Sequence, residues 1–272
     1  MTGPFPPFEP NGPADPRGPR LSEIPLRMIV PNMITVLAIC AGLSGVRMAF
    51  EGRFQLAVTM VLIAAFLDGI DGRIARALKA TSKFGAQMDS LADIVNFGVA
   101  PALVLYAWIL DQAGSSGWIA ALLYVIACSL RLARFNVMSE EPDRPAWRND
   151  FFVGVPAPAG ATLVLLPVYL GFLGLPLEPA FAYLSAAYVV VIGLLLVSRL
   201  PVYSGKTASA LVSRDMVMPL ILAVALYALM VASYPWQMLS LTAAAYIASL
   251  PFGARLYARR EKQHEQVIEP VE

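Results

Sequence analysis

Long, nearly uninterrupted apolar segments are the feature that most restricts how this chain can fold. The first, Met28–Phe50, carries one charged residue, Arg47, near its end. A membrane-spanning helix needs about 20 consecutive, predominantly apolar residues, and this segment is long enough. Seven further apolar segments follow: Phe54–Leu67, Phe84–Leu110, Trp118–Leu130, Ala157–Leu173, Phe181–Val197, Met216–Val231 and Trp236–Leu250. The shorter ones must extend into their flanks, so the sequence predicts an all-α polytopic membrane protein with about eight transmembrane helices.

The composition supports this class and excludes several kinds of chemistry. Hydrophobic residues make up 58% of the chain and charged residues 14%, against about 25% charged in soluble domains. The single histidine, His264, lies in the polar C-terminal segment, so histidine-based zinc sites are not expected. Both cysteines, Cys40 and Cys128, lie inside apolar segments, which argues against a disulfide scaffold. A net charge of +1 gives no general attraction to nucleic acid.

The distribution of basic residues predicts the orientation in the membrane. Of the 20 lysines and arginines, 18 fall in the two terminal segments and in alternate connections between the apolar segments. The positive-inside rule therefore places both termini in the cytoplasm and the protein in the cytoplasmic membrane. We expect a disordered, Pro-rich cytoplasmic tail over 1–27, a membrane-embedded domain over 28–256 and a charged cytoplasmic tail over 257–272.

Four aspartates interrupt the apolar pattern within a short stretch. Asp68 and Asp71 end the second apolar segment, and Asp89 and Asp93 begin the third. The spacings i, i+3 and i, i+4 put each pair on one helix face, and two antiparallel helices would bring all four carboxylates together. Such a cluster near lipid repels itself unless a cation is bound. An all-oxygen ligand set favours Mg²⁺, Mn²⁺ or Ca²⁺ over zinc, and two divalent ions would balance four carboxylates.

The full spacing pattern adds glycines and an arginine to these acids. Residues 68–93 read Asp-x2-Asp-Gly-x2-Ala-Arg-x8-Gly-x3-Asp-x3-Asp. This pattern resembles the signature of the CDP-alcohol phosphatidyltransferase family, with every spacing matched. The stretches Arg131–Asn136 and Phe152–Pro158 resemble those of its bacterial and archaeal members that use serine, the phosphatidylserine synthases.

The resemblance implies a membrane enzyme that transfers the phosphatidyl group from CDP-diacylglycerol to the hydroxyl of L-serine and releases CMP. It implies two bound divalent cations, Mg²⁺ or Mn²⁺, and a homodimer in the lipid bilayer. Asp68, Asp71 and Asp89 would hold the metal ions. Asp93 would be the general base and a further contact to the second ion.

The resemblance also indicates residues for the substrates. The CDP-lipid candidates are Asn32, Thr35, Gly72, Ala75, Arg76, Ser82 and Gly85. The candidates for the serine carboxylate or the lipid phosphates are Lys83, Arg131, Arg134 and Lys206. Arginine suits this task because its planar guanidinium pairs with a carboxylate through two hydrogen bonds.

Two other interpretations stay open at this point. Another member of the same family would use glycerol 3-phosphate or an inositol phosphate as the acceptor alcohol. A cation transporter, a different class of protein, would also need carboxylates inside the membrane. It would need them near the bilayer midplane rather than clustered near one face, and it would not require the Gly and Arg positions.

Overall fold

The computed structural model of the chain describes residues 26–80, 82–139, 151–203 and 214–268. Lys206 therefore lies outside the described residues. So does the expected disordered tail over 1–27, except for its last two residues, which begin α1. The described elements, in chain order, are α1 (Leu26–Phe50), α2 (Phe54–Ala77), α3 (Lys83–Asp93), the π-helix η2 (Ile94–Val99), α4 (Ala100–Trp108), the 3-10 helix η3 (Leu110–Ala113), α5 (Ser115–Ser139), β1 (Phe151–Val153), α6 (Ala157–Val164), α7 (Leu166–Phe172), α8 (Pro179–Val197), β2 (Pro201–Tyr203), α10 (Arg214–Ser233) and α11 (Pro235–Ile268).

Six helical segments in the described part of the chain are long and apolar enough to cross a membrane. They are Ile29–Phe50, Phe54–Ala77, Phe84–Trp108, Ser115–Met138, Pro179–Val197 and Met216–Ser233. The predicted class, an all-α polytopic membrane protein, is thereby confirmed. The count of eight helices stays a prediction.

The two remaining predicted spans have a different form. The apolar stretch Ala157–Phe172 is divided into α6 and α7 at Leu165. Pro167 explains the break, because proline has no N–H to donate to the preceding turn and its ring clashes with that turn. The stretch Trp236–Leu250 lies within α11, which continues through the charged C-terminal segment to Ile268.

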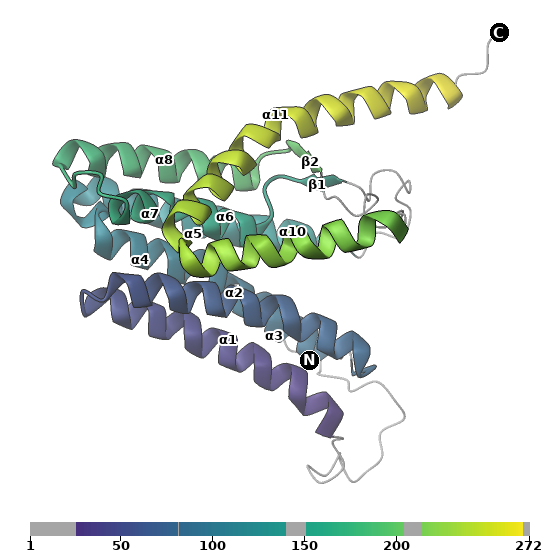
Figure 1. Cartoon of the computed structure of the whole chain (residues 1–272), viewed down its shortest axis with the longest axis horizontal. Coiled ribbons are helices and arrows are strands. Elements are labelled where there is room, and N and C mark those ends of the chain that lie inside the picture. Colours follow the sequence, from purple (N-terminus) through teal and green to yellow (C-terminus); the bar gives the residue numbers. More distant parts are fainter. Residues whose placement is uncertain (1–25, 81, 140–150, 204–213, 269–272) are drawn as a thin grey trace, which may run out of the picture.

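The helices form a bundle with short connections at one end (Figure 1). α1 packs along α2, and α5 packs along α8. The other end of the bundle holds the beginning of α3 and a two-stranded antiparallel ladder in which Phe151 pairs with Tyr203. This ladder joins two connections that are distant in sequence. Gly154 follows β1 with a φ of +76°, and a Cβ there would lie 2.5 Å from the carbonyl oxygen of Leu196, so this turn requires glycine.

The core lies between α4, α5, α6 and α8, around fully buried side chains such as Tyr124, Leu105 and Leu163. The hydroxyl of Tyr124 donates a hydrogen bond of 2.9 Å to the carbonyl oxygen of Phe97 in η2. A buried hydrogen bond of this kind contributes about 1 kcal/mol and fixes the irregular turn in the core. Cys40 is an exposed free thiol and Cys128 a buried one.

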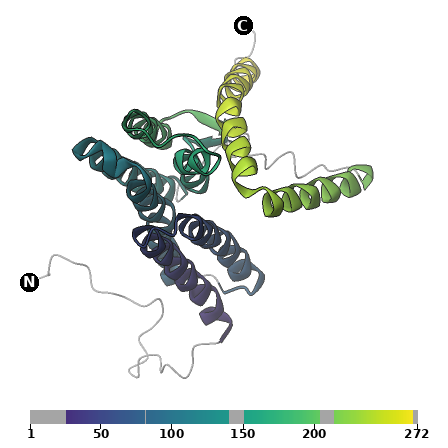
Figure 2. The same ribbon diagram turned by 60° about the vertical axis from the view of Figure 1, so that its left-hand side comes forward.

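α10 projects away from the bundle, and α11 connects it to the other helices (Figure 2). α11 packs against α7 and β2, whereas the main neighbour of α10 among the described elements is α11. From Met216 to Met230 the side chains of α10 are exposed and apolar, including Leu222 and Met218. A surface of this composition suits contact with lipid, whose tails are as apolar as leucine.

Candidate active site

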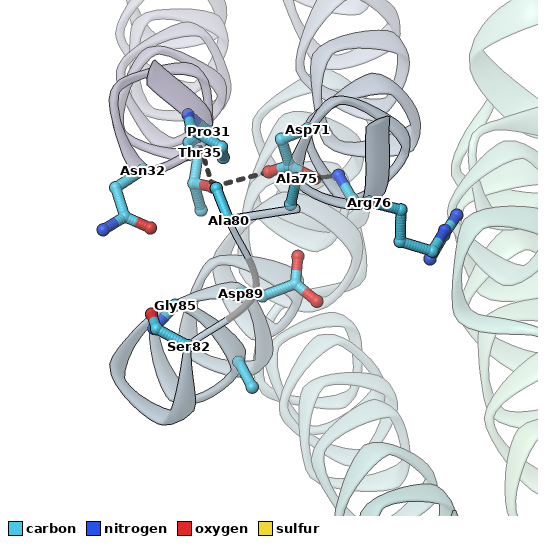
Figure 3. A pocket seen from close by; sticks show the side chains of 12 residues that line it. Pro31, Asn32, Thr35, Asp71, Ala75, Arg76, Ala80, Ser82, Gly85 and Asp89 are labelled. Atoms are coloured by element: carbon cyan, nitrogen blue, oxygen red, sulfur yellow. Dashed lines mark hydrogen bonds between the residues drawn. The ribbon is translucent and has the colours of Figure 1, made fainter. Parts of the chain in front are cut away.

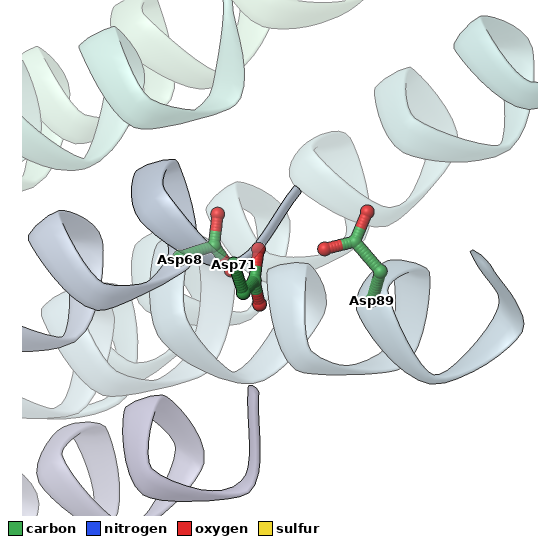
Figure 4. Close-up of side chains that lie close together, drawn as sticks. All are labelled: Asp68, Asp71 and Asp89. Carbon is green, nitrogen blue, oxygen red and sulfur yellow. The ribbon is translucent and has the colours of Figure 1, made fainter. Parts of the chain in front are cut away.

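Three of the four aspartates come together where α2 and α3 meet. Asp68, Asp71 and Asp89 each offer a carboxylate oxygen, and these oxygens lie within 4.8 Å of one another (Figure 4). Asp68 and Asp71 are one helical turn apart on α2, and Asp89 approaches from α3. The helical spacing read from the sequence therefore does produce a shared carboxylate cluster.

The cluster forms no ion pair among the described residues, although Arg76 acts electrostatically on Asp89. The ion pair found in the described part of the chain joins Arg47 to Glu51, which are neighbours on the exposed end of α1. One oxygen of Asp68, Oδ1, is buried without a hydrogen-bond partner in the described structure. Three close carboxylates without a cation repel one another, and their hard oxygen ligands match the preference of Mg²⁺ or Mn²⁺. The donor set therefore fits a divalent metal site.

Asp71 is the aspartate that the surrounding helices hold most firmly. It is 3% exposed, and its Oδ2 accepts a hydrogen bond of 2.6 Å from the hydroxyl of Thr35 on α1. Its Oδ1 accepts from the backbone N–H of Gly72. These bonds orient the carboxylate before any ligand binds.

Asp93 has a different environment from the other three aspartates. It lies one turn further along the chain than Asp89, at the end of α3, and it is partly buried. It interacts electrostatically with Asp68 and Asp89 and, less strongly, with Arg131 on α5. Asp93 therefore adjoins the cluster of three without belonging to it, and it interacts more strongly with Asp68 and Asp89 than with Arg131.

A cavity of about 220 Å³ adjoins the cluster (Figure 3). Asp71 and Asp89 line it, so the carboxylates form part of its wall. All seven residues predicted to bind the CDP-lipid also line it: Asn32, Thr35, Gly72, Ala75, Arg76, Ser82 and Gly85. The cavity thus gathers residues from α1, α2 and the beginning of α3.

Two of these lining residues shape the beginning of α3. The side chain of Ser82 caps the helix by accepting a hydrogen bond of 3.0 Å from the backbone N–H of Gly85. A Cβ at Gly85 would lie 3.1 Å from Oδ1 of Asn32 and 3.1 Å from Oγ of Ser82. Glycine therefore lets α3 approach α1 closely at the cavity.

The predicted basic residues have separate environments. Arg131 is 8% exposed, and its Nε has no hydrogen-bond partner among the described residues. Arg134 instead donates from Nη1 to the carbonyl oxygen of Val197 at 2.8 Å, at the C-terminal end of α8. Lys83 begins α3, and Lys206 lies outside the described residues.

Two further polar residues face this region and were not singled out from the sequence. Tyr246 on α11 interacts electrostatically with Arg131, and its hydroxyl is buried without a partner in the described structure. Asn96 in η2 lies beside Asp68. No sequence pattern marks Tyr246, because it is distant in the chain from Arg131 and comes near it only in the folded protein. Asn96 gives a weak one, since it is an amide in an otherwise apolar stretch.

Helices long and apolar enough to cross a membrane, an adjoining cavity and a carboxylate cluster that could hold a metal ion together define a membrane protein with a candidate active site. Comparison with known families gives the particular class. The CDP-alcohol phosphatidyltransferase family model matches residues 28–197, and a second model, CDP-alcohol phosphatidyltransferase 2, matches residues 215–251. The chain belongs to the CDP-alcohol phosphatidyltransferase family, as its aspartate signature predicted.

Curated relatives cover most of the chain. The chain is 40% identical over 229 residues to the CDP-diacylglycerol–serine O-phosphatidyltransferase of Mycobacterium leprae, covering 82% of this chain and 74% of the relative. It is 37% identical over 257 residues to the protein of the same name from Mycobacterium bovis, covering 93% and 86%. It is 38% identical over 172 residues to the one from Helicobacter pylori, covering 63% and 70%.

Proposed function

We propose that this protein transfers the phosphatidyl group of CDP-diacylglycerol to the hydroxyl of L-serine, giving phosphatidylserine and CMP. The observation that carries this proposal is the cluster of Asp68, Asp71 and Asp89 at the wall of a cavity lined by all seven expected CDP-lipid residues. The names of the curated relatives support serine as the acceptor.

Asp68, Asp71 and Asp89 would hold two divalent cations, Mg²⁺ or Mn²⁺. The family generally uses divalent cations, and the unpaired carboxylates fit them. When bound, such ions neutralise a diphosphate and stabilise the negative charge on the departing phosphate. Asp71 supports this site through its fixed orientation, since Thr35 and Gly72 hold both of its oxygens.

The cavity between α1, α2 and α3 would receive the CDP portion of the lipid. Gly72 and Gly85 leave the backbone open to close approach by a bulky ligand. Arg76 is exposed on the same wall and can pair with a phosphate oxygen. The outer surface of the helices is apolar, so the acyl chains of the lipid can stay in the bilayer.

Asp93 would be the general base. A serine hydroxyl is a poor nucleophile at neutral pH, so a nearby carboxylate must take its proton as it attacks. The serine oxygen forms a bond to the phosphorus that carries diacylglycerol, the bond from that phosphorus to the bridging oxygen of CMP breaks, and the proton goes to Asp93. We propose direct displacement without a phosphatidyl-enzyme intermediate.

Arg131 is the best-placed candidate for the carboxylate of serine. It is buried beside Asp93, and its Nε is available for a hydrogen bond. The hydroxyl of Tyr246 adds a second donor in the same region. Arg134 is a weaker candidate because its guanidinium already binds the end of α8.

The site would open to the cytoplasm from the cytoplasmic membrane, and the protein would act as a homodimer. Asp68 and Asp71 lie toward the end of α2 and Asp89 lies in α3, on either side of the connection that carries Lys79, which supports a cytoplasmic position. This position suits the reaction, because serine and CMP are water-soluble while the lipid stays in the membrane.

The test incubates membranes that contain the protein with CDP-diacylglycerol and labelled L-serine. We expect label in the lipid fraction and CMP release with Mg²⁺ or Mn²⁺, both abolished by a chelator. CMP release with glycerol 3-phosphate or an inositol phosphate but not with serine would keep the family and refute the acceptor. Absence of CMP release with every alcohol would refute the transferase itself.

A further inference from the structure

Asn96 is a buried amide without a role in the reaction as proposed. Its side chain is 0% exposed, and neither Oδ1 nor Nδ2 makes a hydrogen bond among the described residues. Most buried polar side-chain groups in folded proteins have a hydrogen-bond partner, so an exception indicates strain or function. The residue also lies in the π-helix η2, which begins directly after Asp93. Single π-turns inside α-helices frequently occur at functional sites.

The neighbour of Asn96 is one of the proposed metal ligands. Asn96 and Asp68 interact electrostatically, and Oδ1 of Asp68 is itself buried without a hydrogen-bond partner in the described structure. The two groups are complementary, because an amide nitrogen only donates and an ionised carboxylate only accepts. Thr35 holds Asp71 in the same manner, so the cluster already has one example of a neutral donor behind a carboxylate.

The opposite helix makes room for this amide. Gly42 on α1 faces Asn96, and a Cβ at Gly42 would lie 2.7 Å from Oδ1 of Asn96. The next nearest side chain, Ala100, would be 3.7 Å from that Cβ, which is an ordinary contact. The amide is therefore the group that requires glycine at position 42.

We infer that Asn96 is a positioning residue: its Nδ2, unpartnered in the described structure, would donate to the equally unpartnered Oδ1 of Asp68 when a cation is bound, and so leave Oδ2 to face Asp71 and Asp89. This inference rests on the proposed metal site, and it concerns residues outside the aspartate signature. Groups behind a metal ligand fix its orientation, and their loss commonly weakens metal binding by about 10-fold to 100-fold.

The test measures Mn²⁺ binding directly, by electron paramagnetic resonance of the purified full-length protein in lipid nanodiscs, without substrate. Asn96→Leu keeps the size of the side chain and removes the donor, and we expect Mn²⁺ binding to weaken by about tenfold or more. Asn96→Asp keeps the shape, and we expect weakening there too, because a carboxylate cannot donate and repels Asp68. Unchanged binding in Asn96→Leu, or tighter binding in Asn96→Asp, would overturn the inference; the second result would make the side-chain oxygen a ligand itself.

Ser185→Ala is the matched control. The hydroxyl of Ser185 is also buried and unpartnered in the described structure, but it lines a separate apolar cavity between α7 and α8. Its removal should leave Mn²⁺ binding unchanged. A similar loss in this control would mean that any buried polar deletion perturbs the protein, and the inference would fall.

Gly42→Ala tests the same contact from α1, even if Asn96→Leu does not fold. Its added methyl should displace the amide and weaken Mn²⁺ binding. In an Asn96→Ala background the same change should have little further effect, because the atom it meets is gone. A full additional loss in that background would show that position 42 acts through helix packing, and would overturn the role of Asn96.

These outcomes are separable from those of the proposed function. Loss of Mn²⁺ binding on changing Asn96, in a protein that releases no CMP with serine, would uphold the positioning role and refute the acceptor. Serine-dependent CMP release with unchanged Mn²⁺ binding in Asn96→Leu would uphold serine as the acceptor and refute the positioning role.

Discussion

The hydroxyl of Thr35 donates to Oδ2 of Asp71 across 2.6 Å, and this bond joins α1 to the carboxylate cluster on α2 and α3. The same hydroxyl lies 3.2 Å from the carbonyl oxygen of Pro31, but it has one proton. The shorter contact, to a charged acceptor, is the stronger one. Thr35 lines the cavity expected for the CDP-lipid, yet its hydroxyl is directed to Asp71. Its main role is therefore to orient a proposed metal ligand.

Thr35→Val replaces the hydroxyl with a methyl group of similar size. We expect about a tenfold loss of transfer activity and a higher Mg²⁺ concentration at half-maximal rate, because Asp71 loses its fixed orientation. Activity measured against Mg²⁺ concentration tests this. Thr35→Ser, which keeps the hydroxyl, should stay near the wild type. Equal losses in the two variants would attribute the effect to packing.

Asp68→Asn and Asp93→Asn should separate metal binding from proton transfer. Asp68 belongs to the cluster of three oxygens, whereas Asp93 lies outside it, beside Arg131. We expect Asp68→Asn to lose Mn²⁺ binding and activity together. Asp93→Asn should lose activity by about 100-fold or more while retaining Mn²⁺ binding, since general base catalysis contributes 10²–10⁴. Paired measurements of Mn²⁺ binding and CMP release decide this. Equal loss of binding in both variants would make Asp93 a ligand.

Arg131→Ala and Arg134→Ala form a matched pair on one helix. Arg131 is buried beside Asp93 with a free Nε in the described structure, so its loss should raise the KM for serine more than that for CDP-diacylglycerol. Arg134 binds the end of α8, so its loss should lower stability by about 1.5–3 kcal/mol and leave the KM for serine unchanged. Steady-state kinetics and thermal unfolding in detergent check both results. A raised KM for serine in Arg134→Ala, with lowered stability alone in Arg131→Ala, would make Arg134 the serine-binding residue and Arg131 the structural one.

Tyr246→Phe removes one buried hydroxyl from α11 and leaves the ring in place. If this hydroxyl helps Arg131 to bind serine, the KM for serine should rise several-fold, since a hydrogen bond contributes about 1 kcal/mol. The KM for CDP-diacylglycerol should not change. Tyr169→Phe, which removes another buried, unpartnered hydroxyl of the described structure, is the control. An effect of equal size in the control would exclude a specific role for Tyr246.

Much of the fold and the site follows from local sequence pattern. Apolar segments of spanning length predict membrane helices, because the bilayer core excludes charge and requires internally satisfied backbone groups. The spacing of Asp68 and Asp71 predicts a shared face on one helix, and that of Asp89 and Asp93 a shared face on the next, because helical periodicity places residues three and four apart side by side. Four of the seven CDP-lipid candidates, Gly72, Ala75, Arg76 and Gly85, were likewise identifiable from the signature itself, and all seven line one cavity.

Other features depend on how helices pack, which no local pattern specifies. Arg131 and Arg134 are three residues apart and look equivalent in sequence, but the position of α8 gives one of them a structural partner and leaves the other beside Asp93. The approach of α11 to α5 places Tyr246 there, and the pairing of Gly42 with Asn96 depends on the contact between α1 and a π-turn. Sequence periodicity determines which residues share a helix face. The rotation and crossing of neighbouring helices decide what that face meets, because those depend on side chains distant in the chain.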